Sequence, residues 1–198
     1  VGSEMCIRDS RISVDGAPEC SKDRKGMISM IDLQTLTISY GKKVLVDSVN
    51  AEFAPGTVYG LVAPNGHGKT TLLRAMAGLP GPRVDGSIVL DEVQGTGARE
   101  VRSMIFYAPG EGTLLYPGLR AEDHLKMVCD MWPHARDIEE IVEQTQIGEF
   151  AKMGIRTLSQ GMKQQLTLAI AYATGARYLL LDEPMNCLLY TSDAADDS

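Results

Sequence analysis

The residues from Thr57 to Ala77 constrain the fold of this chain more than any other part of it. The short apolar run Thr57–Val62 leads into a glycine-rich stretch, and Thr70–Ala77 has the pattern of a helix that ends at Gly78. The stretch reads Ala63-Pro64-Asn65-Gly66-His67-Gly68-Lys69-Thr70-Thr71. Glycine lets a backbone come close to a phosphate, and a helix N-terminus directs N–H groups at it. The order strand, glycine loop, helix therefore predicts an α/β fold with a phosphate-binding loop.

The residue types in this loop indicate ATP with Mg²⁺ as the ligand. Lys69 is placed to reach the β- and γ-phosphates, the Thr70 hydroxyl to hold Mg²⁺, and Thr71 to contact the α-phosphate. The pattern GxxxxGK[ST] has Ala63 at its first glycine, which costs little if that residue has a negative φ. His67 fills a variable position and is expected to face solvent. The alternative is an ordinary Gly/Asn turn. The predicted nucleotide-binding set is Ala63, Pro64, Asn65, Gly66, His67, Gly68, Lys69, Thr70 and Thr71.

Two further motifs follow the loop in the sequence. The apolar run before Asp182 and Glu183 is typical of a buried strand that ends in carboxylates. Asp182 can hold Mg²⁺, commonly through water, and Glu183 can orient or deprotonate an attacking water. The predicted catalytic residues are Glu183 and Lys69, and the predicted metal ligands are Thr70 and Asp182. The stretch Leu158–Gln165 opens a helix with Ser159, whose hydroxyl can face an anion or serve as an ordinary N-cap.

The remaining elements follow from hydrophobic periodicity. Alternating or short apolar runs predict strands over residues 31–40, 44–53, 87–90, 103–108 and 178–181. Helical stripes predict helices over residues 121–132, 137–147 and 161–174.

Composition excludes some classes of function. The net charge of −7 argues against nucleic-acid binding through a basic face, and no stretch of apolar residues is long enough to span a bilayer. The four cysteines have no CxxC spacing, which favours a reduced, cytosolic compartment over a zinc site.

Both ends of the chain resemble translated sequencing-adapter strings. Residues 1–9 and 187–197 carry these strings, and residues 10–26 are polar without a sustained apolar period. We therefore expect 1–26 to be a non-native or disordered leader, the start to lie at Met27 or Met30, and 187–198 to be a foreign tail. A natural acidic tail is the alternative. The expected domain is 27–186, continued in the intact protein beyond Asn186.

The order of loop, helical insert, Ser159 motif and acidic strand end resembles the nucleotide-binding domain of ABC transporters over Ile31–Asn186. The resemblance implies a P-loop NTPase with a RecA-like core, an antiparallel β-subdomain and a helical subdomain at about 118–160, incomplete at its C-terminus. It implies a head-to-tail dimer in which Ser159, Gln160 and Gly161 touch the nucleotide of the opposite subunit. Gln160 and Met162 depart from the usual LSGGQ. It also implies that Tyr40 stacks on adenine; the alternative is a surface tyrosine at a strand end.

The resemblance further implies an ATPase that powers transport through a separate membrane-spanning permease, on the inner face of the cell membrane, with no nucleic-acid partner. The pattern is most similar to exporters of the multidrug or antibiotic-resistance kind. The alternatives are a soluble ABC ATPase acting on ribosomes or DNA, and an inactive truncated fragment. Two departures bear on activity: Gly110 stands where the family has a glutamine, with Glu111 as a possible substitute, and no histidine follows Glu183.

Overall fold

A computed structural model describes residues 6–10, 31–54, 56–91, 93–94, 99–110 and 114–184 of the chain. The chain divides into two compact units, unit 1 over Val1–Arg102 and unit 2 over Ser103–Ser198. Unit 1 holds Tyr40 and the glycine loop, and unit 2 holds the acidic strand end and the Ser159 motif. Glu111 and the predicted tail 187–198 lie outside the described residues.

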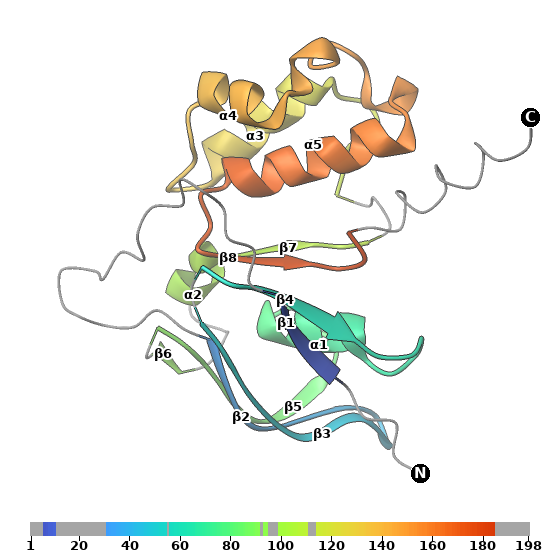
Figure 1. The fold of residues 1–198 in the computed structure, drawn as a ribbon, viewed down its shortest axis with the longest axis vertical. Helices are drawn as coiled ribbons and strands as arrows, with labels where there is room; N and C mark the ends of the chain where they lie inside the picture. The colour runs from blue at the N-terminus through green and yellow to red at the C-terminus, as the bar shows by residue number, and fades with distance from the viewer. Residues whose placement is uncertain are drawn as a thin grey trace, which may run out of the picture. The chain divides into compact units, whose positions relative to one another are not determined.

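Unit 1 contains an antiparallel sheet in the order β3-β2-β5-β6 (Figure 1). Its strands are β2 (Ile31–Tyr40), β3 (Lys43–Phe53), β5 (Arg83–Leu90) and β6 (Val93–Gln94). The predicted alternation of buried and exposed residues along β2 is interrupted. A register shift lies between Leu33 and Leu36, and both of these residues are buried. The shift falls at Thr35, which has a φ of 49° and whose N–H donates to Asn50 Oδ1 at 2.8 Å. The shift keeps the apolar residues on the inner face of β2.

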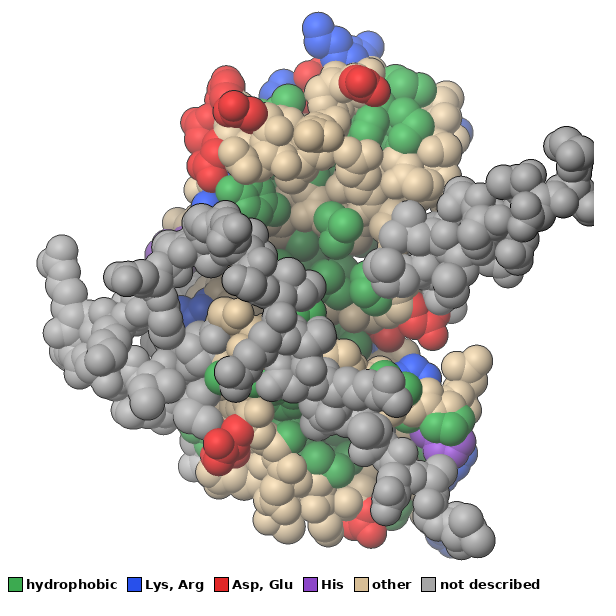
Figure 2. Space-filling view, viewed as in Figure 1, with side chains coloured by type: hydrophobic (Ala, Val, Ile, Leu, Met, Phe, Trp, Pro, Cys, Tyr) green, Lys and Arg blue, Asp and Glu red, His purple; other side chains and the backbone are tan. Residues whose placement is uncertain are grey.

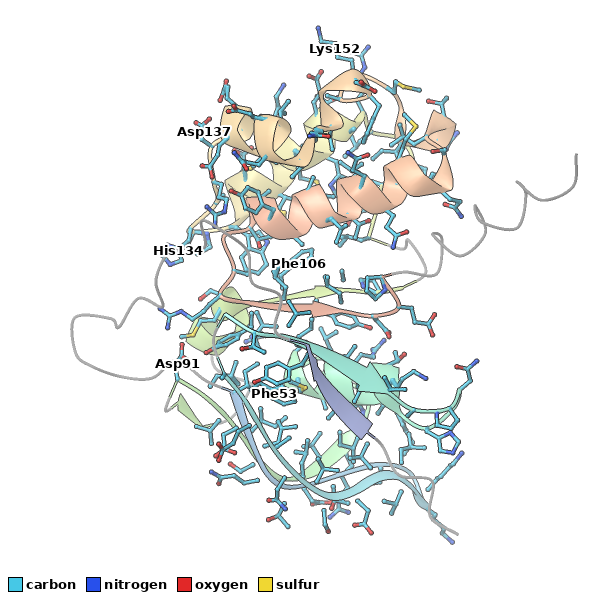
Figure 3. The ribbon with its side chains drawn as sticks, in the orientation of Figure 1. Phe53, Asp91, Phe106, His134, Asp137 and Lys152 are labelled. Atoms are coloured by element: carbon cyan, nitrogen blue, oxygen red, sulfur yellow. The ribbon has the colours of Figure 1, made fainter. Side chains whose placement is uncertain are left out.

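The glycine loop joins β4 (Val58–Val62) to α1 (Lys69–Met76). Strand β4 pairs antiparallel with β1 (Cys6–Ser10), with Cys6 opposite Val62. These five residues of the predicted leader form a strand, and the expectation that residues 1–26 are non-native or disordered stays a prediction. At the end of β3, Phe53 lies edge-on to Tyr59 of β4, with ring centroids 5.0 Å apart (Figure 3).

Helix α1 ends in a Schellman motif. In this motif, N–H groups of residues that follow the helix donate to C=O groups of its last turn. The N–H of Gly78, at a φ of 66°, donates to Ala75 O, and the N–H of Leu79 donates to Arg74 O, both at 3.0 Å. The Arg74 side chain also reaches this turn, since its Nη2 donates to Pro80 O at 3.3 Å. The turn that leads into β5 is therefore held by both the backbone and the side chain of Arg74.

Unit 2 packs helices against a parallel strand pair, β7 (Ile105–Ala108) and β8 (Tyr178–Leu181). The helices are α3 (Ala121–Met131), α4 (Ile138–Thr145) and α5 (Gln160–Ala173), with short 3₁₀ turns η1 (Ile147–Glu149) and η2 (Ile155–Thr157). Its core joins Phe106 of β7 to the apolar faces of the three helices, and Phe106 also meets Trp132 edge-on at 6.0 Å (Figure 3). The fully buried helical members include Leu125, Ile141, Leu166 and Ile170.

One prediction fails at the start of β7. Ser103 and Met104 belong to the helix α2 (Arg99–Met104), so the strand predicted over 103–108 begins only at Ile105. No helix among the described residues is long and apolar enough to cross a membrane.

Backbone hydrogen bonds tie the start of α3 to the segment before η2. The N–H of Ala121 donates to Met153 O at 3.1 Å, and the N–H of Glu122 donates to Ala151 O at 2.8 Å. The N–H of Ile155 returns a bond to Leu119 O at 3.0 Å. These bonds fix the path of the chain toward Ser159.

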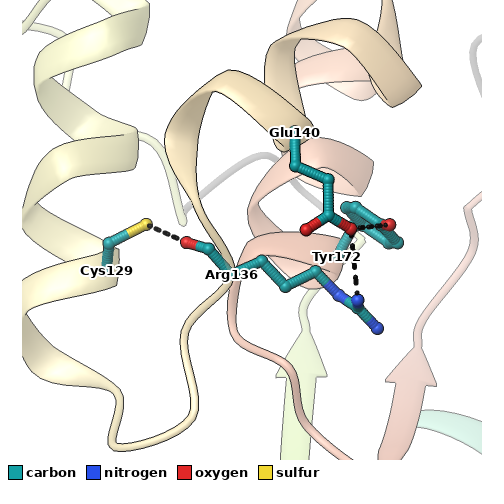
Figure 4. Close-up of polar contacts among 4 residues, drawn as sticks. All are labelled: Cys129, Arg136, Glu140 and Tyr172. Atoms are coloured by element: carbon teal, nitrogen blue, oxygen red, sulfur yellow. Dashed lines mark hydrogen bonds and ion pairs between the residues drawn. The ribbon is translucent and has the colours of Figure 1, made fainter.

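A polar cluster links α4 to α5 (Figure 4). The Tyr172 hydroxyl donates to Glu140 Oε1 at 2.7 Å, and Arg136 forms an ion pair with the same oxygen at 3.4 Å while lying 4.3 Å over the Tyr172 ring. The hydrogen bond to the Glu140 carboxylate raises the pKa of Tyr172, because it stabilises the protonated phenol. The N-cap of α4 is Asp137, whose side chain accepts from Glu139 N at 3.0 Å.

Candidate functional site

The glycine loop in unit 1 has the backbone that a phosphate site requires. Gly66 and Gly68 have φ values of 80° and 87°, a left-handed conformation that glycine adopts at little cost. An added Cβ on Gly68 would lie 3.3 Å from Leu45 Cβ, so β3 packs closely against the loop. Ala63 is not among the described residues with a positive φ. The alanine at the first position of the pattern is thus accommodated without strain.

Helix α1 presents its first amides at the end of this loop. The first helical hydrogen bond runs from Leu72 N to Gly68 O at 2.8 Å. The N–H groups of Lys69, Thr70 and Thr71 precede that bond, and such groups have no partner within the helix. Because these dipoles point out of the N-terminus, they favour an anion there.

Lys69 lies across the loop. Its Nζ donates to Ala63 O at 2.7 Å and to Pro64 O at 3.2 Å. An ammonium has three hydrogens, so these two bonds hold it at the loop and leave a donor for an anionic ligand. The free amides, the left-handed glycines and this ammonium together fit a phosphate chain. When bound, Mg-ATP would supply the phosphoryl group for transfer, and these residues would hold and orient its phosphates.

His67 contacts the carbonyl groups of its own loop. It is half-buried, and its Nδ1 lies 3.2 Å from Pro64 O and 3.1 Å from Asn65 O. A carbonyl oxygen only accepts, so Nδ1 carries the hydrogen in this arrangement. The side chain therefore folds back onto the loop and keeps part of its surface in solvent, as predicted only in part by its variable position. The spacing of the motif carried no signal for this contact.

Tyr40 ends β2 and pairs with Lys43 of β3. Its side chain is 44% exposed, so part of the ring is accessible for stacking. Its hydroxyl approaches Gly81, in the turn that Arg74 holds: a Cβ built on Gly81 would lie 2.8 Å from Tyr40 Oη. The role of Tyr40 at a base stays a prediction.

In unit 2, Asp182 follows β8 and is 8% exposed. Its N–H donates to Ala108 O at 2.9 Å, which extends the pairing with β7, and Tyr107 Oη donates to Asp182 Oδ2 at 3.2 Å. Sequence reasoning did not find Tyr107 as a partner of this carboxylate, since the two lie far apart in the chain. Glu183 is exposed and has a φ of 50°, so the carboxylate proposed for catalysis sits on a strained residue.

Gly110 lies against the same strand end. A Cβ added to it would lie 2.9 Å from Asp182 O and 3.1 Å from Glu183 Cβ. The position therefore has no room for a side chain without a shift of the backbone. This packing accounts for the glycine where the resembled family has glutamine; the suggested substitute, Glu111, lies outside the described residues.

Ser159 is the N-cap of α5. Its Oγ accepts from Met162 N at 3.2 Å, so the ordinary capping role is confirmed. Ser159, Gln160 and Gly161 are all exposed at the helix N-terminus, and a Cβ on Gly161 would meet only Ser159 Oγ, at 4.0 Å. The three residues are accessible, and their contact with a second subunit's nucleotide stays a prediction. The magnesium pair Thr70 and Asp182 is likewise untested.

A strand, a glycine loop with a retained lysine, and a helix define the class of P-loop phosphate-binding folds. The family model described as ABC transporter matches residues 46–186, which is more than half of the chain. This chain belongs to the ABC transporter family, as an ATP-binding domain with the P-loop ATPase fold.

Two relatives illustrate the range of the family. The lantibiotic transport ATP-binding protein SrtF of Streptococcus pyogenes is 34% identical over 162 residues, which cover 80% of this chain and 68% of that protein. The manganese transport system ATP-binding protein MntB of Listeria innocua is 33% identical over 174 residues, covering 83% and 71%.

A solved structure has the same fold. It is a dimeric, post-hydrolysis ATP-binding cassette bound to ADP and Pi, with a TM-score of 0.61 and 20% identity. The likeness covers 79% of this chain and 75% of that one.

Proposed function

We propose that this chain binds Mg-ATP at the Ala63–Thr71 loop, and that the intact protein is the ATP-hydrolysing subunit of a transporter whose membrane-spanning permease is a separate chain. The observation that carries this proposal is the loop itself: left-handed Gly66 and Gly68, and Lys69 held at Ala63 O and Pro64 O. Family membership supports ATP as the nucleotide.

The proposed chemistry divides among named residues. Lys69 and the amides at the start of α1 bind the phosphates, Tyr40 stacks on the base, and Thr70 with Asp182 holds Mg²⁺. Glu183 orients or deprotonates the attacking water. Ser159, Gln160 and Gly161 contact the nucleotide of the opposite subunit in a homodimer or a paired ATPase dimer. The dimeric state of the similar cassette supports such pairing.

The subclass we propose is an exporter of the multidrug or antibiotic-resistance kind, working on the cytoplasmic face of the membrane. Its support is the lantibiotic transport relative. The manganese transport relative is almost as similar in sequence, so the cargo is the property that needs its own experiment. Drug accumulation in cells that lack the gene would rise for an exporter and stay unchanged for a metal transporter.

A soluble ABC ATPase acting on ribosomes or DNA is the second candidate. The acidic balance speaks against it: outside the adapter-like ends, which contribute −4 of the total charge of −7, the chain has a net charge of −3. Acidic side chains also gather over α4, where Glu139 and Glu143 are exposed (Figure 2). Fractionation of cells separates the two, since the proposed subunit sediments with membranes through its permease and a ribosomal factor sediments with ribosomes.

Substitution of Lys69 tests the nucleotide site. Lys69→Ala removes charge-assisted hydrogen bonds to phosphate, each worth roughly 1.5–3 kcal/mol, and should weaken Mg-ATP binding by about a hundredfold or more. The measurement is isothermal titration calorimetry, and Lys126→Ala, at an exposed position of α3, is the control that should bind as wild type does. Equal affinities of wild type and Lys69→Ala would overturn the proposal.

A further inference from the structure

Gly81 adjoins the tip of Tyr40 in a turn between α1 and β5. Its φ of +134° is a conformation that L-residues rarely adopt, and its missing side chain leaves the space next to the phenol oxygen. A Cβ there would lie 2.8 Å from Tyr40 Oη and 3.7 Å from Tyr40 Cζ. Atoms at such a distance clash, and the end of a side chain gives way more readily than backbone does. An alanine at position 81 would therefore displace the Tyr40 ring.

The turn that contains Gly81 is hydrogen-bonded to α1, the helix that follows the phosphate loop. Leu79 N bonds to Arg74 O at 3.0 Å, and Arg74 Nη2 bonds to Pro80 O at 3.3 Å. Arg74 lies in the same eight-residue helix as Lys69. The turn that carries Gly81 is thus bonded to α1 through Arg74 and Pro80, and the absent side chain of Gly81 leaves the space beside Tyr40 Oη.

We propose that Gly81 and Arg74 are positioning residues for base recognition, because they set the place of the Tyr40 ring relative to the phosphate-binding helix. A nucleotide that is held at both its phosphates and its base needs a fixed spacing between the two contacts. The turn held by Arg74, with no side chain at Gly81, supplies that spacing by fixing the room available to the Tyr40 ring. This inference rests on the proposed function, in which Tyr40 stacks on the base of ATP.

The test compares ATP with a ligand that lacks a base. Calorimetry measures the binding of Mg-ATP and of inorganic tripolyphosphate with Mg²⁺ to the full chain. Gly81→Ala should weaken ATP binding by about fivefold or more, which is the scale of a lost base–aromatic stack, and change tripolyphosphate binding less than twofold. The control is Gly56→Ala, which also places a side chain at a positive φ (+67°) but in open space, and it should leave both affinities unchanged.

A double variant makes the test specific to the hydroxyl contact. Tyr40→Phe removes the atom that an alanine at position 81 would meet, so it should restore most of the ATP affinity in the Gly81→Ala background while changing little alone. If Gly81→Ala matches Gly56→Ala, weakens both ligands equally, or is not rescued by Tyr40→Phe, the positioning role is overturned. If Gly81→Ala does not fold, as judged by circular dichroism, Arg74→Met replaces it. Arg74→Met should weaken ATP and not tripolyphosphate, and the absence of that selective loss overturns the role.

Different results would show that the proposed nucleotide binding itself is wrong. Tyr40→Ala should reduce ATP affinity by about fivefold or more because the stacking ring is gone. A wild-type chain that does not bind Mg-ATP, or a Tyr40→Ala variant that binds as tightly as wild type, overturns the nucleotide site itself and the role of Gly81 with it.

Discussion

At the scale of single residues, packing selects glycine at position 110, where the chemistry of the site would favour a polar side chain. A polar side chain here would be useful beside Asp182, yet the backbone of Asp182 and the Cβ of Glu183 occupy the space where a Cβ would stand. Close packing leaves little freedom for such atoms to retreat. Any group that assists Asp182 must therefore come from another residue, and Tyr107 is one that does.

Introducing the family's glutamine should consequently destabilise the chain. Gly110→Gln should lower the free energy of unfolding by about 1–3 kcal/mol, the usual cost of overpacking. Gly118→Gln is the matched control, since a Cβ on Gly118 meets nothing within 4 Å, and it should change stability by less than about 0.5 kcal/mol. Urea unfolding measures both, and equal stabilities of the two variants would contradict the packing argument.

At the scale of elements, the sequence predicts segments with a clear apolar pattern well, whether long like β2 or short like β8, and predicts segments without one poorly. The predicted bounds of β2 and β8 are confirmed, and those of α5 agree within one residue at each end, because the apolar pattern spans the whole element. The six-residue α2 and the two-residue β6 are too short to establish a period. Side-chain contacts such as His67 on the loop carbonyls depend on folded geometry and leave no mark on the spacing.

Helix α5 offers a matched pair of leucines. Leu166 is fully buried in the core of unit 2, whereas Leu168 is 44% exposed on the same helix. Leu166→Ala should cost about 2–5 kcal/mol of stability, through lost burial and the cavity left behind. Leu168→Ala should cost less than about 1 kcal/mol, because it leaves no cavity in the core. Urea unfolding decides, and similar costs for both would contradict the assignment of the buried face.

At the scale of the whole molecule, the chain combines a phosphate-binding unit with a unit that carries the carboxylates and the Ser159 motif. In the proposed mechanism, phosphoryl transfer needs both sets of groups, since the first would position the phosphates and the second would supply the carboxylate that activates water. Binding and turnover are therefore separable properties of this chain.

We expect the 198-residue polypeptide to bind Mg-ATP without steady-state turnover. Gly110 provides no side chain for Mg²⁺ or water, and the space beside it is filled by Asp182 O and Glu183 Cβ. Phosphate release in the presence of Mg-ATP should stay at the level of a blank. A turnover that disappears on Glu183→Gln would contradict this expectation, because only a catalytic carboxylate would respond in that way.

The tie between residues 119–122 and 151–155 consists of main-chain groups. Every amino acid except proline brings the same N–H and C=O groups, so most substitutions leave this tie intact. The path of the chain that leads to Ser159 therefore tolerates most substitutions in these segments. A protein that shares only a third of its residues with a relative can therefore keep the N-terminus of α5 at Ser159 in place, while the residues on its surface change.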